Sequence, residues 1–265
     1  MGSDAEVYIF DEVTFQEIVV PTFHKLLFDG SFDLWLKEIW DKLNQEGFNI
    51  PAQAFGGVDF EKNCHYLNPD FSYTDSEKDQ WTSDWDVRAC TSVTCPDKEQ
   101  CPLHTSNKQQ TAEELNILFE AAISARCLGQ SQFVGRSMSP MKYGDVLAEL
   151  DGETEQKVYQ LLRLLEFRGF IIGDQFANSD GIHGWLSVEE TGNLVDLLQN
   201  MDLPQFEKSF EAMEGFRVKL HNGLAYKASS GYSFKHLSLA FLRTVGTLAV
   251  EQDKGILWGN DILGP

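Results

Sequence analysis

The sequence Ser233-Phe-Lys-His-Leu-Ser-Leu-Ala-Phe-Leu-Arg-Thr-Val-Gly-Thr-Leu-Ala-Val-Glu-Gln252 is followed closely by Gly255-Ile-Leu-Trp-Gly259. Apolar residues recur every three or four positions in the first stretch, which predicts a long helix with one apolar side. These residues are Leu237, Ala240, Phe241, Val245, Leu248 and Ala249. The short apolar run after it predicts a strand. A helix that leads into a strand indicates a fold that uses both kinds of element.

Other helices are predicted along the rest of the chain. Residues 153–167 form a strongly amphipathic pattern, and Ser187 with Glu190 matches a capping box before a helix that runs to about Met201. Near the N-terminus, Thr14 with Glu17 matches another capping box, and Pro21 marks a helix start or a kink. Further helices are expected over residues 31–47, 111–127, 139–150 and 204–213.

Strands are expected only as short apolar runs, at residues 7–10, 132–134, 170–172 and 255–259. They do not alternate regularly with helices, so a doubly wound parallel sheet is not expected. The predicted fold class is therefore α+β, predominantly helical, with a few short strands and a long irregular insertion that contains cysteines. We expect a single globular domain over residues 1–265, with this insertion at 49–110 inside it.

The insertion carries the clearest chemical signal of the sequence. Four of the five cysteines fall in it, with a histidine, at Cys64, Cys90, Cys95, Cys101 and His104. Thiolate sulfur and imidazole nitrogen are the ligands that a tetrahedral zinc ion prefers. The two-residue gap between Cys101 and His104 lets one turn present two ligands. A structural zinc site of Cys90, Cys95, Cys101 and His104 is the first hypothesis, and Cys64 or His65 could replace one ligand.

Two alternatives remain for these residues. Four thiolates, from Cys64, Cys90, Cys95 and Cys101, would suit an iron–sulfur cluster, although the spacing matches neither ferredoxin pattern. Reduced thiols or one disulfide without metal is the other. A catalytic zinc would also need an open coordination position and a base nearby.

The charge limits the choice of partners. The 265 residues carry a formal net charge of −20. Such a field repels phosphate backbones and anionic lipid surfaces, so we expect no nucleic acid bound by ordinary phosphate contacts and no membrane. It permits a basic protein partner, a cation-binding role or simply high solubility. The acidic first residues show no signal-peptide pattern, and a cytoplasmic location is expected.

The sequence shows no established catalytic motif. Residues 178–185 predict a Gly-containing turn that carries His183, while His221 and His236 are single histidines without a visible partner. Cys127 is expected to be a small buried hydrophobe. The protein is therefore expected not to be an enzyme but a soluble, acidic binding or regulatory protein, inhibitor-like or immunity-like toward a basic partner. The alternative is a metalloenzyme or iron–sulfur redox protein that uses the Cys64–His104 region.

Overall fold

A computed structural model describes residues 4–48, 50, 109–128, 133–138, 143–167, 181–204, 232–260 and 262. The chain packs as two compact units. The first, which we call the sheet unit, comprises Met1–Glu12, Leu128–Arg168 and Asp180–Ile262. The second, the helical unit, comprises Val13–Cys127, Gly169–Ser179 and Leu263–Pro265. The predicted single domain with its 49–110 insertion stays a prediction, because residues 51–108 lie outside the described ones.

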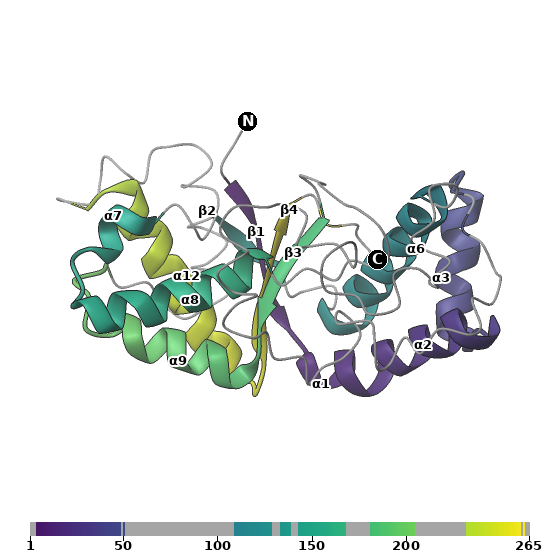
Figure 1. Ribbon diagram of the computed structural model, residues 1–265, viewed down its shortest axis with the longest axis horizontal. Coiled ribbons are helices and arrows are strands. Elements are labelled where there is room, and N and C mark those ends of the chain that lie inside the picture. The colour runs from purple at the N-terminus through teal and green to yellow at the C-terminus, as the bar shows by residue number, and fades with distance from the viewer. Residues whose placement is uncertain are drawn as a thin grey trace. The chain divides into compact units, whose positions relative to one another are not determined.

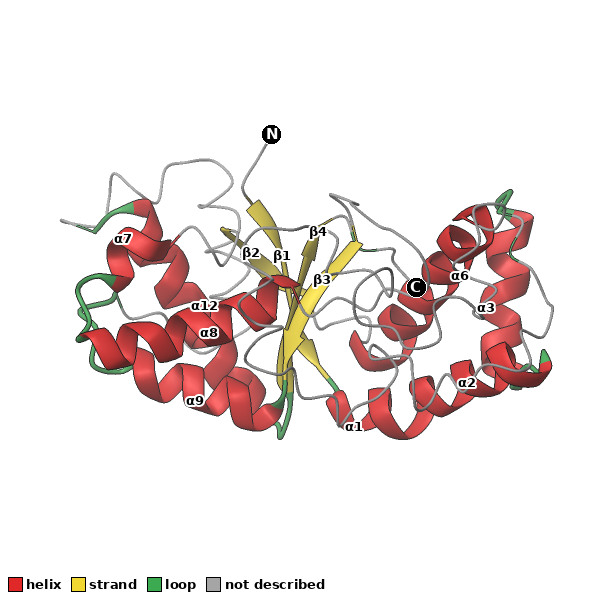
Figure 2. Cartoon of the chain, in the orientation of Figure 1, coloured by secondary structure: helices red, strands yellow, loops and turns green. Residues whose placement is uncertain are grey.

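The sheet unit is built on four antiparallel strands, drawn in yellow in Figure 2. They are β1 (Asp4–Phe10), β2 (Phe133–Met138), β3 (Gly181–Leu186) and β4 (Gly255–Asn260), in the order β2-β1-β4-β3. The predictions of strands at 7–10 and 255–259 are confirmed, and β2 extends further than predicted. Irregular pairing occurs between Val7 and Tyr8 and between Ile182 and Gly184.

Four helices complete the described part of this unit. They are α7 (Gly144–Leu147), α8 (Gly152–Phe167), α9 (Val188–Leu198) and α12 (Phe234–Val250). Figure 1 shows α8, α9 and α12 together on one side of the strands. Helix α12 contacts β1, β2 and β4, α8 contacts β3, and α9 packs on both α12 and β4. The α+β class, mostly helical with short strands, is therefore confirmed.

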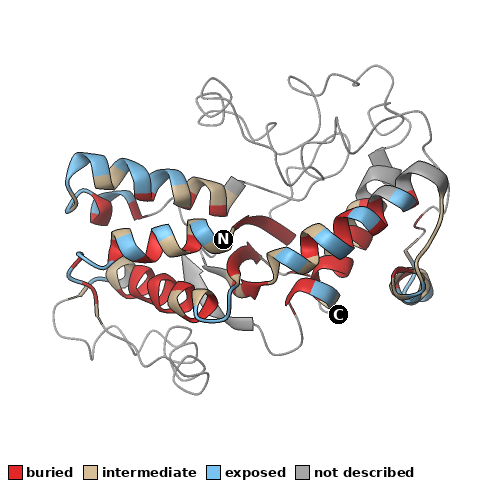
Figure 3. Cartoon of the chain, turned by 90° about the horizontal axis from the view of Figure 1, so that it is seen from below, coloured by how far each residue is buried: buried red, intermediate tan, exposed pale blue. Residues whose placement is uncertain are grey.

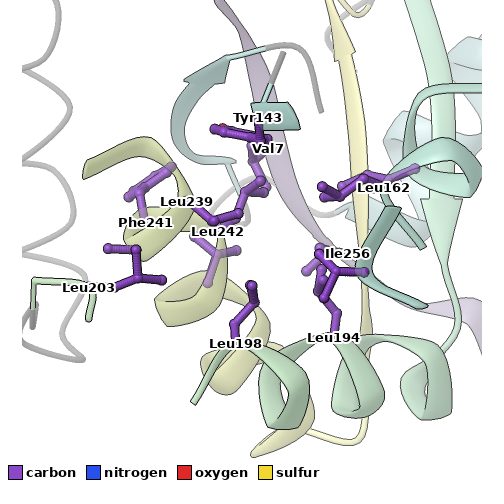
Figure 4. Close-up of a cluster of buried hydrophobic side chains, with 14 of the residues drawn as sticks. Val7, Tyr143, Leu162, Leu194, Leu198, Leu203, Leu239, Phe241, Leu242 and Ile256 are labelled. Atoms are coloured by element: carbon purple, nitrogen blue, oxygen red, sulfur yellow. The ribbon is translucent and has the colours of Figure 1, made fainter. Parts of the chain in front are cut away.

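The core of the sheet unit lies between these helices and the sheet. Alternate residues of β1 and β4 face it, because side chains of a strand point to opposite sides in turn. Val7 and Ile9 of β1 and Ile256 and Trp258 of β4 belong to this cluster. Figure 4 shows Val7 and Ile256 close to leucines from the three helices, among them Leu162, Leu194, Leu198 and Leu242. Burial of this apolar surface is the main stabilising contribution to the unit.

Helix α12 is buried more completely than the sequence pattern predicted. Every residue from 237 to 246 is buried, including Leu239 and Leu242, which lie off the predicted apolar side. A helix that is apolar on most sides occupies the interior of a fold rather than its surface. Helices α8 and α9 are only partly buried, and Figure 3 shows helices of this kind with buried and exposed residues on opposite sides.

The helical unit contains α2 (Val20–Asp29), α3 (Leu34–Gln45) and α6 (Gln109–Ile123). A short α1 (Glu12–Thr14) and a π-helical turn, η1 (Phe15–Val19), precede α2, and a second π-helical turn, η4 (Ser124–Leu128), extends α6. Phe119 of α6 packs against Phe15 and Phe23, with ring centroids 6.2 and 4.6 Å apart. These aromatic contacts join α6 to the N-terminal helices of the unit.

Two predicted helix starts in this unit differ from the structure. The capping box predicted for Thr14 and Glu17 is wrong, because the helix begins at Glu12 and Thr14 makes no capping hydrogen bond. Helix α3 starts after Asp33 rather than after Ser31. The carboxylate of Asp33 accepts hydrogen bonds from Thr22 and Lys25 instead of capping α3. The predicted stop at Gly47 is confirmed, and Gly47 has a φ of 105°, a conformation that favours glycine.

In the part of the chain that the structure describes, none of the helices has the length and apolar character needed to cross a membrane.

Candidate functional site

The predicted metal ligands cannot be placed in the fold. Cys64, Cys90, Cys95, Cys101 and His104 all lie outside the described residues, as does the alternative ligand His65. The described ranges contain no group of three Cys, His, Asp or Glu side chains suited to a metal ion. Cys127 is described and is 1% exposed, as predicted for a small buried hydrophobe.

The described residues bring one polar cluster together at the N-terminus of α12. Ser233 is the N-cap residue, with extended backbone (φ −75°, ψ 166°). Its Oγ accepts a hydrogen bond from the His236 amide at 3.4 Å, and its carbonyl accepts one from the Leu237 amide at 3.1 Å. Serine is favoured at this position because its side chain satisfies an amide that has no partner within the helix. The start of α12 is therefore fixed by Ser233.

The imidazole of His236 connects this cap to a second element. Its Nδ1 lies 2.7 Å from Ser233 Oγ, and its Nε2 lies 3.1 Å from Oε1 of Glu149. Glu149 comes from the turn after α7, 87 positions earlier in the chain. A carboxylate can only accept, so Nε2 donates to Glu149, and when the ring is neutral Nδ1 carries no hydrogen and accepts from the serine hydroxyl. The three side chains form one hydrogen-bonded line, which we call the Ser–His–Glu line.

The surroundings of the Ser–His–Glu line are polar and charged. Lys235 pairs with Asp145, and this hydrogen bond lowers the pKa of the Asp145 carboxyl. The hydroxyl of Tyr232 donates to Asp202 at 2.8 Å, which raises the pKa of Tyr232. The ring of Tyr232 lies 6.0 Å from that of His236. The side chain of His236 is only 18% exposed, whereas Ser233 and Glu149 on either side of it are exposed.

A buried cation holds the chain near this cluster. The guanidinium of Arg243 donates to the carbonyls of Leu198, Leu203 and Pro204 at 3.2, 3.4 and 3.1 Å. The last carbonyls of a helix lack partners within it, and Arg243 supplies one for Leu198 at the end of α9. Burial lowers the pKa of Arg243 from its usual value. Arg243 thereby fixes the segment that carries Asp202.

The helices around the cluster form a surface rich in acids. Residues 143–167 and 181–204 contain ten Asp or Glu and two Lys or Arg. We call the exposed and half-exposed acids of α7, α8, α9 and their turns the acidic surface: Asp145, Glu149, Asp151, Glu153, Glu155, Glu189, Asp196 and Asp202. Five of them, Asp151, Glu155, Glu189, Asp196 and Asp202, form no ion pair with any described residue. Their charge is therefore available to a partner.

Two histidines differ from their sequence interpretation. His183 was predicted in a turn but lies in strand β3, where it is buried and its ring is 4.8 Å from that of Trp258. The sequence shows no partner for His236, and Glu149 reaches its ring only through the fold. The spacing Ser233-x-x-His236 at the start of a helical pattern was the one local signal for this cluster. No family model, curated protein or solved structure matches the chain.

Proposed function

We propose that this chain is a binding or regulatory protein whose acidic surface docks a basic protein partner. The observation that carries the proposal is the local imbalance of charge in residues 143–167 and 181–204, which include α7, α8 and α9 and contain ten acids but two bases. Lys157, one of these bases, already pairs with Glu153 at 2.7 Å. An uncompensated field of one sign steers an oppositely charged partner and raises its association rate.

The described residues also show the excess of acids over bases. The described residues hold twenty-five of the forty-one Asp and Glu but only ten of the twenty-one Lys and Arg. The excess of acids around α7, α8 and α9 supports a role in recognition, because a field of one sign attracts a partner of the opposite sign. An inhibitor-like or immunity-like action on the basic partner would follow from covering its functional surface.

A matched pair of variants tests this proposal. The triple variant Glu155→Lys, Glu189→Lys and Asp196→Lys reverses three acids of the acidic surface that form no ion pair with a described residue. The control, Glu17→Lys, Glu38→Lys and Glu46→Lys, changes the net charge equally on exposed acids of the helical unit. Affinity capture from the native host at low and moderate salt should retrieve one partner with the wild type and the control but not with the first variant. Equal loss in both variants, or no salt-dependent partner, would contradict the proposal.

We further propose that zinc stabilises the 49–110 insertion through Cys90, Cys95, Cys101 and His104, with Cys64 as the alternative ligand. Thiolate and imidazole donors fit zinc, and a metal can order a segment that has little apolar core. Metal analysis and an ultraviolet–visible spectrum of anaerobically purified protein test this. About one zinc per chain without visible absorbance would support it. Iron with a brown chromophore would favour the redox alternative, and absence of metal would contradict both.

A further inference from the structure

We propose that Ser233 is a nucleophile, activated by His236, that hydrolyses carboxylic esters of neutral or positive charge. The proposal is independent of the acidic surface's binding role and rests on the Ser–His–Glu line. A serine hydroxyl is a weak nucleophile until a base accepts its proton, and the base must lie within hydrogen-bond reach. Ser233 Oγ and His236 Nδ1 are 2.7 Å apart, so this condition is met.

The second requirement is a group that orients the base. Glu149 Oε1 lies 3.1 Å from His236 Nε2 and so fixes the tautomer whose Nδ1 can accept the serine proton. It also stabilises the imidazolium that forms when His236 takes the proton. Glu149 does not reach the reacting atoms and is therefore a positioning residue. The arrangement of nucleophile, base and carboxylate follows the general geometry of serine hydrolases, with the two ring nitrogens exchanged in role.

The third requirement is a donor for the negative oxygen of the tetrahedral intermediate. Amides of the first helical turn point outward at the N-terminus of a helix, and the residue after a nucleophile commonly supplies such a donor. At α12, the amides of His236 and Leu237 bond to Ser233. Those of Phe234 and Lys235 have no acceptor within the described part of the chain. They are positioned to stabilise an oxyanion beside Ser233.

The reaction balances with water as the only co-reactant. Ser233 Oγ bonds to the ester carbonyl carbon while His236 Nδ1 takes the hydroxyl proton. The bond from that carbon to the leaving oxygen breaks, and the imidazolium returns the proton to the alcohol. Water then attacks the acyl-serine with His236 as base, which releases the acid and restores Ser233. The neighbouring carboxylates of Asp145, Glu149 and Asp202 disfavour an anionic ester, and this sets the substrate class.

Covalent labelling of the full chain with a fluorophosphonate tests the proposal, because Ser233 Oγ would bond to phosphorus as fluoride leaves. We expect a single adduct on the peptide that contains Ser233. His236→Ala should slow labelling by about 100-fold or more. Ser233→Asn should abolish it, and since asparagine also caps helices this variant should stay folded. Ser187→Ala is the control, because Ser187 caps α9 without a histidine partner. This variant should be labelled at the same rate as the wild type.

Glu149→Gln separates positioning from a purely structural role. It should reduce the labelling rate and move the midpoint of its pH profile downward, with an unchanged unfolding temperature. The proposal is overturned if folded wild type gains no adduct, if the adduct persists in Ser233→Asn, or if Ser187 is labelled equally well.

Discussion

Helices α9 and α12 both begin with a serine cap, but the third residue of each helix gives the two caps different chemistry. At α9, Ser187 Oγ accepts from the Glu190 amide at 3.1 Å, and the Glu190 carboxylate accepts from the Ser187 amide at 2.9 Å. At α12 the equivalent residue is His236, whose ring meets Ser233 Oγ itself. In the α9 capping box, both side chains bond to backbone amides of the same turn. At α12, the His236 side chain instead bonds to Glu149, which belongs to another element.

The charges near these two helix starts also differ. The N-terminus of a helix carries a partial positive charge that favours acids. Helix α9 has Glu189 and Glu190 in its first turn, and Glu12 accepts from the Val188 amide at 3.2 Å. Helix α12 has no acid in its first turn and carries Lys235 and His236 there instead. Asp145 and Glu149 from α7 and its turn compensate these residues, so the start of α12 depends on another element.

The largest effect is expected where α12 supports the other end of α9. Arg243→Met would leave the carbonyls of Leu198, Leu203 and Pro204 without their buried donor. We expect the free energy of unfolding to fall by about 3 kcal/mol. Urea denaturation measures it. Lys254→Met, which removes a partly exposed cation paired with Asp11, is the control and should cost less than about 1 kcal/mol. Equal effects would show that Arg243 does not anchor α9.

The middle of the α9–α12 contact gives a matched pair of glycines. A Cβ at Gly246 of α12 would lie 2.8 Å from Val195 Cγ2, whereas one at Gly192 of α9 would have Val250 Cγ2 4.0 Å away as its nearest atom. Gly246→Ala should therefore destabilise by about 2 kcal/mol through overpacking. Gly192→Ala should stabilise by up to about 1 kcal/mol, because alanine favours the helix. Thermal unfolding of both variants measures the two changes in stability, which should have opposite signs. Changes of the same sign would contradict the packing described.

A smaller difference is expected between the caps themselves. Ser187→Ala breaks a closed capping box and should cost about 1 kcal/mol. Ser233→Ala should cost about 0.5 kcal/mol, since its capping hydrogen bond to the amide is longer, at 3.4 Å. Chemical denaturation of the two variants side by side gives the comparison. A greater loss at Ser233 would mean that the His236–Glu149 connection contributes to stability as well as to chemistry.

The smallest expected effect on stability concerns the start of α8, where the carboxylate of Asp151 caps the helix. The side chain and amide of Thr154 donate to Asp151, and this lowers the pKa of the Asp151 carboxyl. Because the pKa of Asp151 is lower in the folded state, its ionised carboxyl stabilises the fold at pH values above the unfolded pKa of about 3.9. This stabilisation is lost as the pH falls through the pKa of the folded state. Asp151→Asn and Asp151→Ser both keep a cap without the titration. Their unfolding temperatures should fall less steeply below pH 4 than that of the wild type, and an unchanged slope would contradict this account.

These helix starts also show how far the sequence alone could lead. The box of Ser187 and Glu190 was predicted because both partners lie within one turn. The Ser–His–Glu line was not, because Glu149 joins it only after α7 and α12 pack together. The sequence predicts a Gly-containing turn over residues 178–185, whereas Gly181–Leu186 form strand β3, in which Gly184 permits close packing. A Cβ there would lie 2.6 Å from the Leu165 carbonyl oxygen of α8. Patterns within a few residues therefore predicted helix starts and strands. They could not predict contacts between segments that are far apart in the sequence.

The pairing of β1 with β4 has a consequence for synthesis of the protein. Glu6 lies opposite Gly259, so the two central strands of the sheet come from positions some 250 residues apart. On the ribosome, β1 is synthesised some 250 residues before β4, which pairs with one of its two edges, while β2 pairs with the other. During that interval the edge of β1 can recruit other chains, as unpaired strands do. The interval before β4 is synthesised is therefore the stage at which we expect β1 to need protection from aggregation.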